Sequence, residues 1–297
     1  MEHSLAAITE AWGQWLRQQL PAQTWAQKGV QIHIKGHTGS ALAFAMEAVA
    51  SQSQKPQLMV AQDREEAAYL FNDLQALVGN QAVFFPESYR RAYDVEETDN
   101  GNIMLRTEAL NLIGQGKAFI MVSYPEALSE KVLAPQTLKS SRHTLRLGDP
   151  LDMDFLTDLL IEFDFEREDF VYEPGQFALR GGLMDVFSYA MDQPVRIEFD
   201  GDSIGSLRTF DPESQLSTGS LSQADLVPSI ERKLEHESRI GLIDFFPVAP
   251  LLWTFSTEAL EEKLNSRFAE AQERFDTLDG PVKRQQPDQL YLSAEAW

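Results

Sequence analysis

The chain has 297 residues, with 25 Lys and Arg against 46 Asp and Glu, a net charge of −21 and no cysteine. This length predicts about two domains, or three, and a hydrophobic fraction of 43% excludes a mainly disordered chain. The lack of Cys excludes disulfides, thiolate metal ligands and a thiol nucleophile, and it fits a reducing cytoplasm. No apolar run reaches the ~18 residues of a membrane span. The acidic charge argues against direct nucleic-acid binding, which needs clustered Lys and Arg.

The first 143 residues alternate between helical and strand-like periodicity. The predicted helices cover residues 5–16, 41–50, 65–78 and 104–112, and the predicted strands cover residues 30–34, 58–61, 82–85 and 118–122. Short apolar strands separated by helices are typical of a parallel sheet covered on both faces. We therefore predict an α/β domain with a parallel sheet over residues 1–143.

The pattern changes over residues 144–231. An amphipathic helix is expected at 152–163, and short alternating segments follow at 177–180, 183–187, 195–199 and 206–210. Pro174-Gly175, Gly181-Gly182 and residues 200–202 supply turn signals between them. We predict a small inserted α+β domain with an antiparallel sheet.

Residues 232–297 are more difficult to interpret from periodicity. The apolar segments at 240–246 and 251–253 predict strands, and residues 257–275 predict a long charged helix. The polar residues 276–297 indicate a linker or an incomplete domain.

A glycine-containing loop lies between the predicted strand at 30–34 and the helix that follows it. Its positions that bear on phosphate binding are Gly36, Gly39, Ser40, Ala41, Leu42 and Ala43. A P-loop reads G-x-x-x-x-G-K-[ST]; its Lys reaches the phosphates and its Ser or Thr holds Mg²⁺. Leu42 and Ala43 stand at those two positions. Leu42 cannot offset phosphate charge, and Ala43 cannot ligate Mg²⁺. The loop is either an incidental Gly-rich turn or a degenerate nucleotide loop that does not bind ATP.

Four segments in order support the second interpretation. Residues 36–40 resemble the GVTGSGKT loop of the nucleotide-excision-repair helicase UvrB, and residues 145–167 resemble the entry to its second domain. Residues 180–187 resemble its RGEVIDIF segment, and residues 206–212 resemble its RLSLFDP segment. The resemblance implies a degenerate P-loop, helicase-like (RecA-like) first domain.

Two departures separate the chain from UvrB. Residues 244–254 resemble the approach to UvrB's DESH box, but Phe255 and Ser256 stand at its carboxylate positions, so the Walker B acids that Mg²⁺ and water activation require are missing. UvrB's DNA-clamping β-hairpin has no counterpart. A UvrB-like module with a degenerate ATP site resembles the N-terminal module (domains 1a, 2 and 1b) of the transcription-repair coupling factor family.

This resemblance implies domain 1a over residues 1–143, a UvrA-docking domain 2 over 144–231, and part of domain 1b with a linker over 232–297. Complete coupling factors are ATP-dependent DNA translocases that displace stalled RNA polymerase and recruit UvrA. Their motor domains use ATP and Mg²⁺, and we expect these domains, and the contacts with RNA polymerase and double-stranded DNA, to lie outside this chain. The alternative is a UvrB-like, ATP-dependent damage-recognition helicase module.

For this segment, the resemblance implies UvrA binding without catalytic residues, cofactor, metal or membrane contact. Position by position, the candidate UvrA contacts are Arg167, Phe177, Arg180, Arg196 and Glu198, with Phe177 as an apolar anchor beside the patch. Ala178 stands where UvrB has a further Arg. Arginine is favoured at interface hot spots because its planar guanidinium offers five donors and stacks well. The alternative is that each Arg is solvated and paired locally, worth ~0–1 kcal/mol.

Other constellations carry weaker signals. His33 and His37 have a zinc-like H-x-x-x-H spacing but fall on a predicted strand and loop, so we expect no metal there. Asp152, Asp154 and Asp158 fit the N-terminal turns of a helix better than a calcium loop. Residues 89–91 (Tyr-Arg-Arg) are a small basic–aromatic cluster that we interpret as a surface loop.

The charge is unevenly distributed. Residues 144–231 contain 19 acidic and five basic residues, and three of those five are the candidate arginines. The negative electrostatic potential of so acidic a region repels DNA and suits a protein partner.

Overall fold

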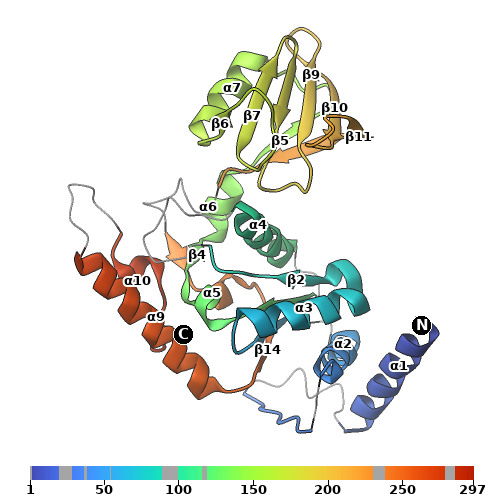
Figure 1. Ribbon diagram of the computed structural model, residues 1–297, viewed down its shortest axis with the longest axis vertical. Coiled ribbons are helices and arrows are strands. Elements are labelled where there is room, and N and C mark those ends of the chain that lie inside the picture. Colours follow the sequence, from blue (N-terminus) through green and yellow to red (C-terminus); the bar gives the residue numbers. More distant parts are fainter. Residues whose placement is uncertain are drawn as a thin grey trace.

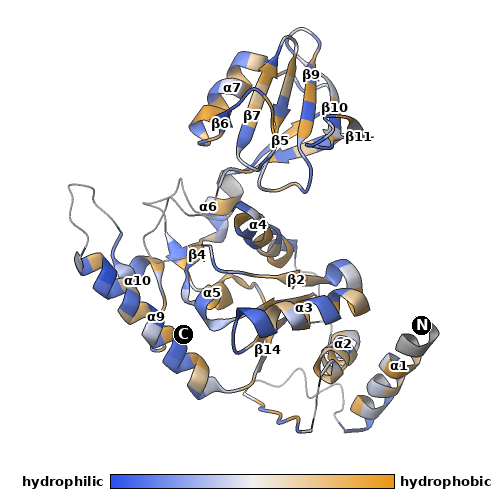
Figure 2. Cartoon of the chain, in the orientation of Figure 1, coloured by the Kyte–Doolittle hydropathy of each residue, from blue (hydrophilic) through white to orange (hydrophobic). Residues whose placement is uncertain are grey.

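The computed structural model describes residues 2–19, 29–36, 39–53, 55–88, 100–115, 119–229, 238–277 and 285–297. These residues form two bodies, an α/β body with a parallel sheet and a smaller body built mainly on an antiparallel sheet (Figure 1). The predicted combination of a parallel and an antiparallel sheet in a mixed α/β chain is confirmed. Apolar residues follow the strands of both bodies, where the two cores lie (Figure 2).

Four strands form the parallel sheet in the order β14–β1–β3–β2. They are β1 (Gln57–Val60), β2 (Ala82–Phe84), β3 (Ile120–Ser123) and β14 (Leu251–Thr254). Every residue of β1 and β3 is buried, as expected for strands between two layers of helices. The register aligns Gln57 with both Ile120 and Leu251, so a strand from late in the chain completes the sheet.

Helices surround this sheet. They are α1 (Glu2–Gln19), α2 (Ala41–Ser53), α3 (Arg64–Val78), the 3₁₀ turn η2 (Gly79–Gln81), α4 (Asn100–Gln115), α5 (Pro125–Ser129), α6 (Pro135–Ser140), α8 (Leu242–Phe245), α9 (Thr257–Thr277) and α10 (Pro287–Leu290). The Asp63 side chain caps α3 by accepting a hydrogen bond from the Glu66 N–H at 2.8 Å. Among the described helices, none has the length and apolar character that crossing a bilayer requires.

The predicted strand at 30–34 is not formed. Residues 31–35 have no regular secondary structure, and the Val30 and Ile32 side chains are 44% and 38% exposed. A strand needs a partner strand, and no described strand pairs with this segment. The alternating segment is therefore not part of the described sheet.

The strand that was expected over residues 240–246 is also wrong. The segment 240–246 contains only the end of β13 (Arg239–Ile240), which pairs with β4 (Val132–Leu133), and then α8. Leu242 and Phe245 are both buried, and their spacing of three places them on one face of a helical turn.

Residues 285–297, for which a linker or an incomplete domain was expected, pack on the α/β body. Tyr291 and Leu292 are 4% and 3% exposed, and the Leu292 N–H donates to the Ser129 carbonyl at 2.7 Å. The segment is polar overall, but its Tyr291 and Leu292 belong to the core of the α/β body.

The smaller body contains α7 (Met153–Glu162) and a six-stranded sheet in the order β11–β10–β9–β8–β7–β6. Its strands are β6 (Glu166–Arg167), β7 (Gln176–Arg180), β8 (Leu183–Val186), β9 (Val195–Phe199), β10 (Ile204–Phe210) and β11 (Ser217–Ser220), and a separate pair joins β5 (His143–Arg146) to β12 (Gln223–Leu226). All pairs are antiparallel except β6–β7. We call residues 143–226 the antiparallel body.

Local sequence signals explain this body well. The Asp152 side chain caps α7 by accepting from the Phe155 N–H at 2.6 Å. Gly181 and Gly201 adopt positive φ at the turns between β7 and β8 and between β9 and β10, where the sequence predicted hairpins.

The two bodies meet at α4. Met104 of α4 packs against an apolar cluster of the antiparallel body formed by Val171, Ala178, Phe187 and Phe210. The Tyr189 hydroxyl donates to Asn100 Oδ1 at 3.2 Å. The start of α4 thus contacts the face of the six-stranded sheet opposite α7.

Candidate functional site

The six-stranded sheet has one apolar and one polar face. Phe177, Met184, Val186 and Ile197 point toward α7 and form a core. Because side chains alternate along a strand, Arg180, Asp185, Arg196, Glu198 and Arg208 lie on the opposite face. The candidate arginines of β7 and β9 therefore share the outer face of the sheet.

Asp185 is the centre of this outer face. Its side chain is 1% exposed, and it lies directly across from Arg196 in the register of β8 and β9. Arg196 donates from Nε to Oδ1 at 2.8 Å and from Nη2 to Oδ2 at 2.9 Å. This two-bond geometry is the strong form of an Arg–carboxylate pair. The hydrogen bonds that Arg196 donates to the Asp185 carboxylate raise the pKa of Arg196, so the guanidinium stays charged.

Arg196 is largely committed to the fold. Its side chain is 14% exposed, it stacks over the Phe210 ring at 4.5 Å from the centroid, and its Nη1 donates to the Gln215 carbonyl at 3.1 Å. Gln215 belongs to the loop between β10 and β11. The pair of Arg196 and Asp185 therefore fixes this loop on the sheet.

Arg180 shares the same carboxylate but is more accessible. It pairs with Asp185 Oδ2, and its Nη2 donates to Gln215 Oε1 at 3.3 Å. Its side chain is 34% exposed, and its guanidinium lies 5.0 Å from the centroid of the Phe170 ring. A partner protein can reach this guanidinium without disrupting the core.

Glu198 lies at the exposed end of the same face. It accepts from Arg208 Nη2 at 3.0 Å and from Ser206 Oγ at 3.0 Å. The carboxylate is 52% exposed, which leaves it accessible to a partner and makes the Arg208 pair a weak contributor to stability.

The structure does not bring all five candidate residues together. Arg167 is exposed on the edge strand β6 and has no described contact with the Asp185 network. Phe177 is fully buried in the core facing α7, so its expected role as a surface anchor is wrong. The alternation that places Ala178 and Arg180 outward places Phe177 inward.

Three residues of this site were not identified from the sequence, namely Asp185, Gln215 and Phe170. The hairpin register around Gly181-Gly182 pairs Arg180 with Leu183 and Ala178 with Asp185, which puts Asp185 on the face of Arg180. That pairing was a usable signal, whereas the position of the loop carrying Gln215 was not.

The described part of the glycine-containing loop leads directly into α2. Gly36 and Gly39 have positive φ, and α2 begins directly after Ser40. Leu42 and Ala43 are buried, 8% and 0% exposed, within the apolar core. Both side chains therefore pack into the core of the α/β body.

Phe255 and Ser256, the residues compared with Walker B acids in the sequence, line a cleft of about 350 Å³ at the carboxyl ends of β1 and β14, where open α/β sheets bind ligands. Ser256 caps α9 by accepting from the Ala259 N–H at 3.1 Å, and its hydroxyl donates to Glu258 at 2.8 Å. Phe255, 41% exposed, lines the cleft with Lys263, which pairs with Glu126 at 3.6 Å. Ser256 therefore has a structural role.

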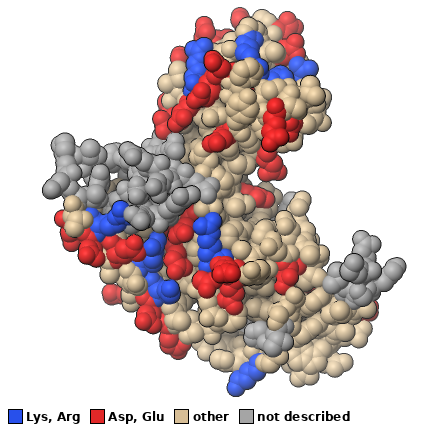
Figure 3. Space-filling model, in the orientation of Figure 1, with Lys and Arg blue, Asp and Glu red and all other residues tan. Residues whose placement is uncertain are grey.

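The remaining sequence candidates receive little support. His33 is exposed, whereas His37 and residues 89–91 lie outside the described residues. Across the described part of the chain, no three His, Asp or Glu side chains gather closely enough to hold a metal ion. Acidic side chains occur over both bodies in the view of Figure 3.

Comparison with known proteins gives these features a context. Residues 144–231 match the model of the UvrB interaction domain family. A transcription-repair-coupling factor of Myxococcus xanthus is 33% identical over 219 residues, which cover 71% of this chain and 18% of that protein. The corresponding factor of Bacillus subtilis (strain 168) is 28% identical over 215 residues, covering 69% and 18%. A UvrABC system protein B of Vibrio vulnificus (strain YJ016) is 32% identical over 208 residues, covering 65% and 30%.

The chain thus spans about 18% of the length of these coupling factors. The resemblance to the UvrB-like module of the transcription-repair coupling factors, inferred from short motifs, is confirmed.

Proposed function

We propose that this module of a transcription-repair coupling factor docks UvrA on the outer face of its antiparallel body and has no ATPase activity of its own. The proposal rests on one observation: the region that matches the UvrB interaction domain is also the region that carries the candidate charged residues. The match to the UvrB interaction domain covers residues 144–231, and this same region holds Arg180, Arg196 and Glu198 on one sheet face. A single buried carboxylate, Asp185, orients two of them.

Arg180 is the strongest candidate for a direct contact. Its guanidinium is held by Asp185 and Gln215 and is still one-third exposed, so it is ordered before binding and loses little entropy on docking. Glu198 offers an acceptor on the same face, and Arg167 extends the proposed contact to the edge of the sheet. Arg196 is largely buried, so its main role is to hold Asp185 and the loop that carries Gln215 in place, and not to contact the partner.

The absence of ATPase activity in this segment is part of the proposal. Leu42 and Ala43 cannot supply the cation and the metal ligand of a P-loop, and Phe255 and Ser256 cannot supply Walker B acids. The degenerate P-loop-like ancestry of the α/β body accounts for this pattern. Translocation, displacement of RNA polymerase and contact with duplex DNA are assigned to other parts of the complete protein.

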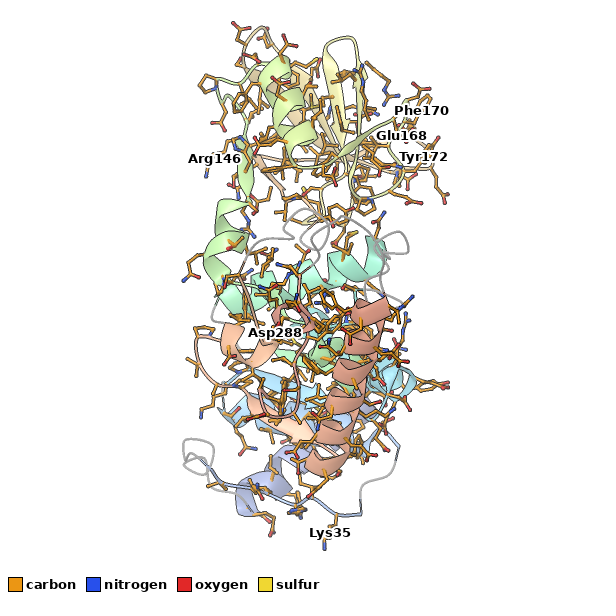
Figure 4. The ribbon with its side chains drawn as sticks, turned by 90° about the vertical axis from the view of Figure 1, so that its left-hand side faces the viewer. Lys35, Arg146, Glu168, Phe170, Tyr172 and Asp288 are labelled. Carbon is orange, nitrogen blue, oxygen red and sulfur yellow. The ribbon has the colours of Figure 1, made fainter. Side chains whose placement is uncertain are left out.

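A titration of purified UvrA with the chain tests the proposal. We expect Arg180→Ala to weaken binding about 30-fold, since truncating a hot spot costs ~2 kcal/mol or more. Arg146→Ala is the matched control, because Arg146 is exposed on the same body and lies in Figure 4 on the opposite side from Phe170, the ring on which the Arg180 guanidinium stacks. Equal affinities of the wild-type chain and Arg180→Ala would remove Arg180 from the interface, and no binding by the wild-type chain would refute UvrA docking.

A further inference from the structure

The loop between β6 and β7 presents two aromatic side chains to solvent. Phe170 and Tyr172 are 45% and 55% exposed, and their ring centroids are 6.5 Å apart. Between them Val171 is fully buried in the cluster with Ala178 and Phe210. The side chains of this segment thus alternate in direction, and the buried Val171 holds the loop on the body. The two rings and Glu168 project away from the body (Figure 4).

This loop is fixed by hydrogen bonds at both ends. Gln176 Oε1 accepts from the N–H groups of Tyr172 and Glu173, both at 2.9 Å. The Glu168 N–H donates to the Phe177 carbonyl at 2.9 Å. The two rings are therefore held in place before any partner arrives, which lowers the entropy cost of using them in an interface.

The aromatic pair is continuous with the arginine site. The Arg180 guanidinium stacks on Phe170, and Gln215 Nε2 donates to the Val171 carbonyl at 3.4 Å. One residue further along the Gln215 loop, Leu216 is 69% exposed. We call Phe170, Tyr172 and Arg180 the aromatic corner.

We propose that the aromatic corner is the apolar anchor of the UvrA-docking surface, the role that the sequence had assigned to Phe177. The inference rests on the proposed function and deepens it. Tyr and Arg are enriched at interface hot spots, and the contacts around a hot spot exclude water from it. Of the residues considered as anchors, Phe177 is inside the core, whereas Phe170 and Tyr172 lie at the surface.

The charges around the corner define the chemistry of its partner. Exposed acids flank the two rings on the same segment: Glu166, Glu168, Asp169 and Glu173. A second copy of the chain placed on this corner would bring these acids against their own equivalents, which costs free energy. The surface instead suits a partner with an apolar pocket for two rings and Lys or Arg around it.

The test is a UvrA titration with the double variant Phe170→Ala/Tyr172→Ala. We expect an affinity loss of about tenfold or more, with Tyr172→Ser alone giving a smaller loss in the same direction. Phe155→Ala is the matched control, because Phe155 is a 51% exposed aromatic on α7, across the sheet from the corner. Far-UV circular dichroism and thermal unfolding verify that each variant is folded.

The outcomes separate the two proposals. If the aromatic variants bind as wild type while Arg180→Ala binds weakly, the aromatic anchor is refuted and UvrA docking stands. No binding by the wild-type chain overturns both. If the wild-type chain self-associates in sedimentation and the aromatic variants do not, the corner is a self-association site and the inference is wrong.

Discussion

Arg196 and Asp185 face each other across β8 and β9, joined by two hydrogen bonds of 2.8 and 2.9 Å and almost closed off from solvent. Arg180 reaches the same carboxylate from β7. Two arginines that look equivalent in the sequence therefore have different roles. One is a buried support for the loop that carries Gln215, and the other is an accessible donor held at the surface.

The first prediction follows from this difference. Arg196→Ala leaves Asp185 with a buried, partly unpaired charge and should lower the free energy of unfolding by about 3 kcal/mol. Arg180→Ala should cost about 1 kcal/mol or less, because its side chain is partly exposed and Asp185 keeps Arg196. Urea unfolding followed by circular dichroism measures both. Equal losses would show that the two arginines support the fold equally.

Sequence reasoning located this body well because its signals are local. Alternating residues predicted β7 to β10, glycines predicted the turns, and Asp152 marked the start of α7. It misplaced Phe177 because a site residue was inferred from proximity in sequence, without applying the alternation that defines the two faces of a strand.

The second prediction concerns the glycine-containing loop. Restoring the P-loop residues with Leu42→Lys/Ala43→Thr should not create an ATP site, because both side chains point into the core. We expect the double variant to be destabilised by about 2 kcal/mol or more through burial of polar groups. Ser51→Lys, on an exposed position of α2, is the control for adding a charge to this helix. Micromolar ATP binding by the wild-type chain or the double variant would favour a UvrB-like nucleotide-binding module.

The third prediction tests the last segment of the chain. Tyr291 packs against Ala271 of α9, so Tyr291→Ala should destabilise the α/β body by about 3 kcal/mol. Asp288→Asn changes an exposed residue of the same segment and should have little effect (Figure 4 labels Asp288). Thermal unfolding distinguishes them. An unchanged Tyr291→Ala melting curve would restore the interpretation of this segment as a linker.

The errors in the α/β body share a cause. Whether residues 30–34 form a strand depends on a partner strand elsewhere in the chain. Whether residues 285–297 pack depends on Ala271 of α9 and on Ser129, which is distant in sequence. Periodicity reports which face of a segment is apolar but not where the matching surface lies.

The fourth prediction is a pH dependence at Glu87. Burial raises the pKa of the Glu87 carboxyl, and the attraction of Arg267, whose Nη2 lies 3.6 Å from Glu87 Oε2, only partly opposes this. In the window between the unfolded pKa, about 4.3, and the higher native pKa, the native state holds more protons than the unfolded state. The contribution of Glu87 to stability is therefore complete below the unfolded pKa and is lost as pH rises through the native pKa.

We expect Glu87→Gln to be more stable than the wild-type chain at neutral pH, with the difference closing as pH falls toward about 4. Denaturant unfolding at a series of pH values measures the difference, and Glu261→Gln, at an exposed position of α9, controls for the change in net charge. A less stable Glu87→Gln at neutral pH would mean that the pair with Arg267 outweighs the cost of burying the carboxylate.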